Sequence, residues 1–152
     1  MNEVDQKDKQ LFNLLITNPS MTQAQLGEKL GVTKLTINNR IKRLKEKKVI
    51  LGNSLILDLD KLGYDVTVVV NVKIKGGKLT ETSEKYATDP HVCSLYTISG
   101  EYDMVLVAKF HNRNQLQNWN EKMTQDTEHI ERVNTSFCFS NPKEGTNPNK
   151  IE

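Results

Sequence analysis

The chain has 152 residues, of which 36% are apolar and 6% aromatic, and its 21 lysines and arginines outnumber 19 acidic residues. No apolar run approaches the roughly 20 residues of a membrane-spanning helix, and the first residues lack the apolar core of a signal peptide, which argues against membrane-spanning and secreted proteins. Two cysteines are too few for a disulfide framework, so we expect a protein of the reducing cytoplasm.

The net charge of +2 conceals an uneven distribution along the chain. Residues 1–50 carry a net charge of +5, whereas residues 51–152 carry −3. Most of the basic excess lies in residues 33–48, which hold seven basic side chains and one acidic side chain. Such a stretch indicates either a polyanionic partner or a solvated lysine-rich helix face, and the surrounding pattern has to decide between them.

The first fifty residues predict three helices. Asp5 can cap the first, whose apolar residues repeat at i, i+3 and i+4, and Pro19 ends it. Thr22 and Gln25 have the spacing of a capping box for a second helix, which Gly31 terminates. A third, basic helix follows this glycine turn, and two helices joined in this way are typical of a helix-turn-helix unit.

The third helix is predicted from its cap, Thr33, to about Lys47. Ile37, Ile41 and Leu44 share one face of it and form a buried stripe. The opposite face is polar and basic and carries an exposed leucine. We therefore expect this helix to bury aliphatic side chains on one side and to offer amide, cationic and apolar groups on the other.

The outward side chains of this helix suit the major groove of DNA. An Asn amide pairs with adenine, Lys and Arg bind guanine, and an aliphatic group can meet the thymine methyl, while cations at the edges reach phosphates. The base-reading candidates are Leu35, Asn38, Asn39 and Lys42. The phosphate candidates are Thr36, Arg40, Arg43 and Lys45. A three-helix bundle with no DNA role is the alternative, which the outward leucine and the single-sign charge disfavour.

Residues 53–64 are predicted to form a linker strand and hinge between two domains. Residues 54–59 have the pattern of a short strand, and Gly63 marks a turn after it. Pairing with the same strand of a second subunit would hide the edges of this strand.

The second half of the chain predicts the order β-α-β-β-α-β. The expected strands are 66–75, 92–99, 102–110 and 130–140, and the expected helices are 78–88 and 112–126. This order is that of a ferredoxin-like domain, an antiparallel sheet with both helices on one face. A domain of this size with one sheet face uncovered favours a partner subunit. Residues 142–152, rich in Asn, Pro and Lys, are predicted to be a flexible tail.

Several motifs taken together resemble the Lrp/AsnC (feast/famine) family of transcription regulators over nearly the whole chain. They are Leu26-Gly27-x-x-x-Gly31-Val32-Thr33, Thr36-Ile37-x-x-Arg40-Ile41-x-x-Leu44, Val49-Ile50-x-Gly52 and Ser99-Gly100-x-Tyr102-Asp103. The resemblance implies an α+β fold, with a winged helix-turn-helix domain at 1–52 and a ferredoxin-like effector and dimerisation domain at 65–141. It further implies a sequence-specific DNA-binding regulator that is not an enzyme, that forms homodimers and octamers, and that needs no cofactor or metal.

The resemblance also implies a small effector, typically an amino acid, bound between dimers near the turn between the second and third strands. The residues that it places in this pocket are Ser99, Gly100, Tyr102, Asp103, Thr135 and Ser136. Backbone N–H groups at the glycine turn could hold a carboxylate, and Asp103 could pair with an ammonium group. Equally, Gly100 could serve only the hairpin turn and Asp103 only cap it. Val133 replaces a threonine that is usual in the family, which argues against an amino-acid effector or changes which one fits.

Two functions other than a sequence-specific regulator are alternatives for this chain. Sirohaem decarboxylases resemble the same two-domain plan, but such an enzyme would need a cavity lined by His and Arg for a tetracarboxylate macrocycle. A nucleoid-type architectural protein would wrap DNA with little sequence preference. A metal site is not expected, because His91, His111 and His129 lack ligand spacing, and Cys93 and Cys138 lie at opposite edges of the predicted sheet.

Overall fold

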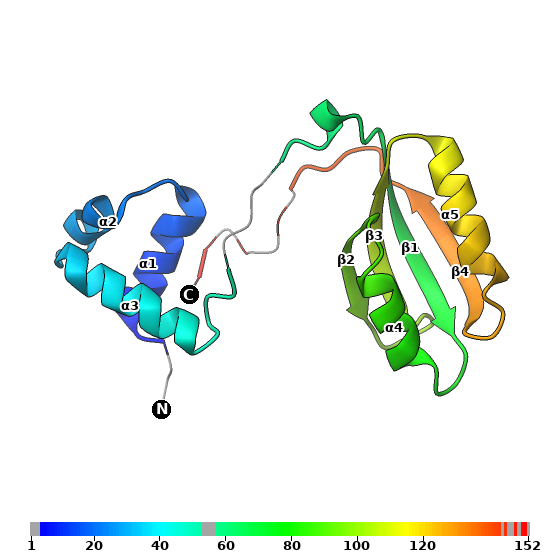
Figure 1. Ribbon diagram of the computed structural model, residues 1–152, viewed down its shortest axis with the longest axis horizontal. Coiled ribbons are helices and arrows are strands. Elements are labelled where there is room, and N and C mark those ends of the chain that lie inside the picture. The colour runs from blue at the N-terminus through cyan, green and yellow to red at the C-terminus, as the bar shows by residue number, and fades with distance from the viewer. Residues whose placement is uncertain (1–3, 53–56, 144, 146–147, 149, 152) are drawn as a thin grey trace. The chain divides into compact units, whose positions relative to one another are not determined.

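The computed structural model describes residues 4–52, 57–143, 145, 148 and 150–151, which form two compact units. The first unit comprises the residues up to 55 together with those from 143 onward, and the second comprises residues 56–142. Each unit has its own hydrophobic core. The helices and strands of both units are labelled in Figure 1. Among the described helices, none is both long and apolar enough to cross a bilayer.

The first unit is the predicted three-helix arrangement. Its helices are α1 (Gln6–Thr17), α2 (Gln23–Leu30) and α3 (Lys34–Glu46). Their fully buried apolar side chains are Leu11, Leu26, Ile37 and Leu44. Asp5, Thr22 and Thr33 cap the three helices as expected, because each side chain accepts a backbone N–H from the first turn. The helix-turn-helix prediction is thus confirmed.

Two glycines are needed at the turn between α2 and α3. Gly31 ends α2 with a φ of 63°, in the left-handed region that favours glycine. Gly27 lies within α2, and a Cβ there would lie 2.6 Å from the carbonyl oxygen of Val32. The turn therefore folds back closely on α2, and this sets the position of α3.

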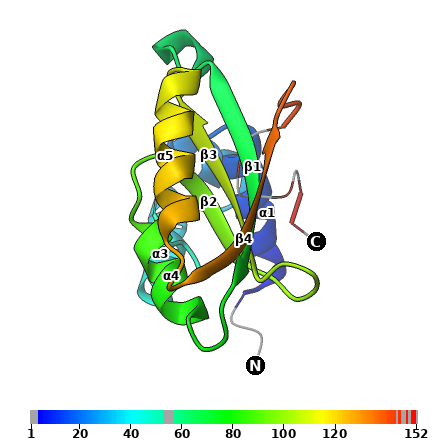
Figure 2. The ribbon, with the colours of Figure 1, turned by 90° about the vertical axis from the view of Figure 1, so that its right-hand side faces the viewer.

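The second unit is the predicted ferredoxin-like domain, and its four strands form one antiparallel sheet in the order β2-β3-β1-β4. The strands are β1 (Val66–Ile74), β2 (Val92–Thr97), β3 (Met104–Phe110) and β4 (Ile130–Phe137). The helices are α4 (Leu79–Ala87) and α5 (Arg113–Gln125). Both helices pack on one face of the sheet, against the core (Figures 1 and 2).

The two faces of this sheet differ in character. Val68, Val70 and Val72 of β1 are completely buried beneath the helices. The alternate side chains point to the other face, where no helix of the unit covers them. That open face carries both apolar and polar groups, including Val69, Val105, Val107, Tyr96, Asn71 and Asn134.

Several expected element boundaries differ from those of the structure. Residues 53–56 of the predicted linker lie outside the described residues, and residues 57–59, predicted as the end of a strand at 54–59, are not a strand. A short 3-10 helix, η1 (Asp60–Leu62), follows them. The third strand begins at Met104, just after Asp103, whose carboxylate accepts the backbone N–H of Ile74 in β1. The second strand ends at Thr97 and the last at Phe137, before the expected limits at Ser99 and Ser140.

In the described part of the expected flexible tail at 142–152, Ile151 is hydrogen-bonded to α1. The side chain of Asn13 in α1 accepts the backbone N–H of Ile151 at 2.6 Å and donates to the Ile151 carbonyl oxygen at 2.9 Å. Residues from 143 onward accordingly belong to the first unit. The flexibility of the tail stays a prediction.

Candidate nucleic-acid interface and ligand groove

The four base-reading candidates share the outward side of α3. Leu35 is 67% exposed, and Asn38, Asn39 and Lys42 are exposed beside it. Lys42 lies 4.0 Å from Glu46, and both side chains are largely exposed, so this ion pair is weak and leaves the ammonium group accessible. The structure thus presents amide, cationic and aliphatic groups together on one helix face.

The inward side of the same helix explains this orientation. Ile37 and Leu44 have no exposed surface and lie in the core of the first unit. Burying them fixes the rotation of α3 about its axis, because the two residues are seven positions apart and lie on the same side. The outward face is therefore set by the core.

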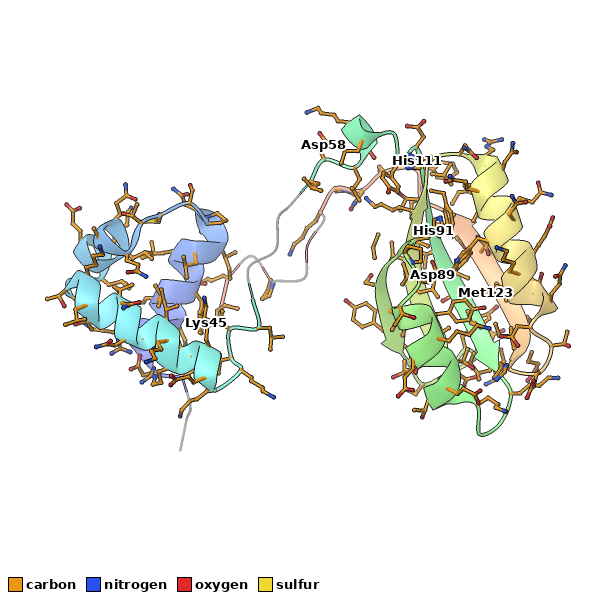
Figure 3. The ribbon with its side chains drawn as sticks, in the orientation of Figure 1. Lys45, Asp58, Asp89, His91, His111 and Met123 are labelled. Carbon is orange, nitrogen blue, oxygen red and sulfur yellow. The ribbon has the colours of Figure 1, made fainter. Side chains whose placement is uncertain are left out.

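The four phosphate candidates have different environments. Lys45 is exposed on α3 (Figure 3), whereas the Thr36 hydroxyl lies 2.9 Å from that of Thr33, beside the helix cap. Arg43 is 42% exposed and Arg40 only 21%. The two arginines turn toward α1, where acidic side chains hold them.

Asp5 and Asp8, at the start of α1, receive both arginines. Arg40 Nη1 donates to Asp5 Oδ2 at 2.6 Å and to Asp8 Oδ1 at 2.8 Å, and Arg43 Nη2 donates to Asp8 Oδ2. The hydrogen bond from Arg40 lowers the pKa of Asp5, and the two carboxylates raise the pKa of Arg40. The sequence pattern by itself did not predict a contact between these two carboxylates and the arginines of α3. The signal available was the matching i, i+3 spacing of the acids on one helix and of the arginines on another.

The turn between β2 and β3 holds Asp103 within the chain. Its carboxylate accepts the backbone N–H of Ile74 at 2.8 Å and the ammonium group of Lys73 at 3.1 Å. These two donors, the backbone N–H first, lower the pKa of Asp103. Gly100 has a φ of 135° in this turn. In one chain, then, Asp103 joins this turn to the end of β1 and is already paired with a cation.

Tyr102 connects the same turn to β4. Its ring centroid lies 5.0 Å from the guanidinium carbon of Arg132, and its hydroxyl accepts a 3.4 Å hydrogen bond from Asn134. Arg132 also pairs with Glu101 at 2.8 Å. This group of side chains extends onto the open face of the sheet, where Asn134 points.

A groove of about 360 Å³ lies between α5 and β4. Its lining residues are Arg113, Leu116, Gln117, Asn120, Thr135 and Phe137. The Thr135 hydroxyl donates to Asn120 Oδ1 at 3.2 Å within it. Ser136 is the next residue of the strand and points to the opposite face of the sheet. The six predicted effector residues therefore do not surround one cavity within a single chain.

The histidines and cysteines of the second unit have separate environments. His91 contacts Asp89 and stacks on Phe110, whereas His111 binds the Gly63 carbonyl oxygen at 2.8 Å (Figure 3). His129 lies between two carboxylates near the end of α5. Cys93 lies in β2 and Cys138 just after β4, at opposite edges of the sheet as predicted.

Comparisons with known proteins agree with both units. Residues 4–50 match the model of a winged helix-turn-helix DNA-binding domain, and residues 67–148 match that of the Lrp/AsnC ligand-binding domain. An uncharacterized HTH-type transcriptional regulator of Pyrococcus furiosus is 34% identical over 93% of this chain and 95% of its own. The regulatory protein AsnC of Haemophilus influenzae is 25% identical over 93% and 95%.

Solved structures show the same fold. The structure of Escherichia coli AsnC superposes with a TM-score of 0.83 at 23% identity, covering 94% of this chain and 97% of that one. A transcriptional regulator of Neisseria meningitidis, solved in complex with L-Met, gives a TM-score of 0.83 at 19% identity and covers 94% of each chain.

Proposed function

The chain belongs to the Lrp/AsnC family of DNA-binding transcriptional regulators, and on that premise we propose that it recognises its DNA sites by inserting α3 into the major groove. One observation carries this proposal. Leu35 is 67% exposed on the same helix whose opposite side, at Ile37 and Leu44, has no exposed surface. An exposed leucine among amides and cations has no packing role in the first unit, but it can bury its surface against a thymine methyl group.

The side chains divide into two roles on DNA. Base edges would be read by Leu35, Asn38, Asn39 and Lys42, which are all exposed on the outward face. Phosphates would be contacted by Thr36, Arg43 and Lys45, which lie toward the edges of that face. Phosphate contacts supply affinity and register, while base contacts supply sequence preference.

We propose that the open face of the sheet makes the dimer. Within one chain the apolar side chains of that face, among them Val69, Val105 and Val107, have no helix against them. Packing two such faces together would shield these groups and would bring two copies of α3 to one palindromic site. Assembly of dimers into an octamer is part of the same proposal.

We propose a small effector for the second unit, of the amino-acid class that the Neisseria relative binds. The residues concerned are Ser99, Gly100, Tyr102, Asp103, Thr135 and Ser136. Because Asp103 is paired with Lys73 and the six do not meet in one chain, the complete pocket would form between subunits. The protein would act in the cytoplasm without a cofactor and without enzymatic activity.

The experiment is selection of bound genomic fragments followed by footprinting, with and without a panel of amino acids. Discrete palindromic protected sites, with affinity that falls as salt rises, are expected. Continuous protection over many helical turns would favour an architectural DNA-wrapping protein. Lys42→Ala should alter the sequences that are protected, because Lys42 is a proposed base-reading residue. Lys122→Ala is its matched control, since Lys122 is an exposed helix lysine of the second unit. Binding that does not depend on salt would contradict the proposal.

A further inference from the structure

The contact between α1 and α3 is built around a carboxylate that is fully buried. Asp8 has no exposed surface, and its two oxygens accept from Arg40 Nη1 at 2.8 Å, from Arg43 Nη2 and from the backbone N–H of Asp5 at 3.0 Å. A buried carboxylate is stable only when it is paired and hydrogen-bonded, and here two cations of α3 meet that need. The pairing therefore joins the DNA-reading helix to α1 at a fixed place.

The two arginines are not equivalent in this network. Arg40 donates hydrogen bonds from a single nitrogen, Nη1, to both Asp5 and Asp8, and its side chain is only 21% exposed. Arg43 bonds Asp8 from one terminal nitrogen and stays 42% exposed, one turn further along the helix. Arg40 is thus turned into the protein, whereas Arg43 binds Asp8 with one terminal nitrogen and keeps part of its side chain exposed.

The terminal nitrogens are what hold both guanidinium groups in place. The Nε groups of Arg40 and Arg43 are buried and have no hydrogen-bond partner among the described residues. A guanidinium group is planar, so fixing one terminal nitrogen restricts where the other donors can point. Asp8 is therefore the group that sets the direction of Arg43.

We propose that Asp8 is a positioning residue for DNA binding. It binds Arg40 and so links α3 to α1, and it holds Arg43 in the orientation that a DNA phosphate contact requires. This inference rests on the proposed function of α3. An arginine held in its binding geometry loses less conformational freedom on association than a free one, so its phosphate contact is more favourable. Arg40, by contrast, is turned into the protein toward Asp5 and Asp8, so it would contact no phosphate and would release no counterion on binding.

The test uses the full-length protein, a random-sequence duplex and KCl from about 50 to 200 mM, because each phosphate contact contributes about 0.9 to the slope of log affinity against log salt. Arg43→Met should reduce the magnitude of the slope by about 0.9. Arg40→Met should leave the slope unchanged, whatever its effect on affinity. Asp8→Asn should weaken binding severalfold in the wild-type chain and have no effect in the Arg43→Met chain.

Three results would overturn the inference. They are a slope reduced by Arg40→Met, a slope not reduced by Arg43→Met, and equal effects of Asp8→Asn with and without Arg43. Circular dichroism shows whether Asp8→Asn keeps its helices, and if it does not fold, the two arginine variants alone decide the outcome. Failure of the wild-type chain to bind any duplex would instead refute the proposed function, and this inference with it.

Discussion

Truncation of Leu44 to alanine should abolish DNA binding while leaving the second unit folded. Leu44 has no exposed surface and is one of only four fully buried apolar side chains in the described core of the first unit. Replacing a buried leucine by alanine costs about 2–5 kcal/mol, and a single small core supplies no more than about 3–5 kcal/mol of stability. The substitution therefore removes most or all of the stability of the first unit.

The chain contains a convenient reporter for this experiment. Trp119 is its single tryptophan and is buried in the core of the second unit, where its indole N–H donates to Asp89 at 2.9 Å. Fluorescence during urea unfolding reports on the second unit, whereas circular dichroism at 222 nm reports on the helices of both. Leu44→Ala should lose helical signal without denaturant and keep the wild-type fluorescence midpoint.

Leu35→Ala is the matched control, because the same truncation at a 67% exposed site should change stability by no more than about 0.5 kcal/mol. This control should weaken DNA binding without loss of helical signal. A fluorescence midpoint that falls in Leu44→Ala together with the helical signal would refute the reasoning, since the two units would then unfold as one.

Three further outcomes are expected. Lys42→Ala should relax base preference at one position of the site by about 1–3 kcal/mol, whereas Lys45→Ala should lower the affinity for all duplexes alike. Competition between cognate and random duplexes measures both effects. Equal losses of affinity for the two duplexes in Lys42→Ala would contradict its assignment as a base-reading residue. Gly27→Ala should lower the thermal midpoint of the helical signal, because its Cβ would lie 2.6 Å from a backbone carbonyl oxygen. Gly52→Ala is the control and should leave the midpoint unchanged, because there is open space around Gly52. Equal midpoints for the two variants would contradict the close approach of the turn to α2. His129 should stabilise the second unit in acid, because neighbouring carboxylates raise its pKa: the contribution is complete below the unfolded pKa of about 6.5 and is lost as pH rises through the folded value. His129→Gln should thus lower the fluorescence midpoint at about pH 5.5 and change it less at about pH 8.5, and a loss independent of pH would contradict this.

Local patterns predicted much of the fold. The caps at Asp5, Thr22 and Thr33 and the glycine stop at Gly31 lie where the sequence placed them, because each depends on residues within one helical turn. The strand predicted at 66–75 likewise appears as Val66–Ile74, because β-branched residues are concentrated there. Such signals depend on spacing along the chain, and spacing can be read without coordinates.

The partners of charged side chains could not be predicted in this way. Helical spacing placed Arg40 beside the DNA face, but Asp5 and Asp8, more than thirty residues earlier, turn it toward α1. For Asp103 the sequence predicted either an effector contact or a hairpin cap, and only the structure shows that its carboxylate binds Lys73 and the backbone N–H of Ile74 at the end of β1.

The sequence by itself determined the helix-turn-helix, the order of strands and helices, and the face that α3 exposes, because periodicity and capping act over a few residues. The tertiary structure decided which cations remain accessible to DNA, and it placed Thr135 in a groove between β4 and α5. The physical reason is how far apart along the chain the interacting residues lie. A hydrophobic stripe needs only an apolar surface to pack on, whereas an ion pair or a ligand pocket needs particular atoms within about 3 Å, which only the packing of distant segments brings together.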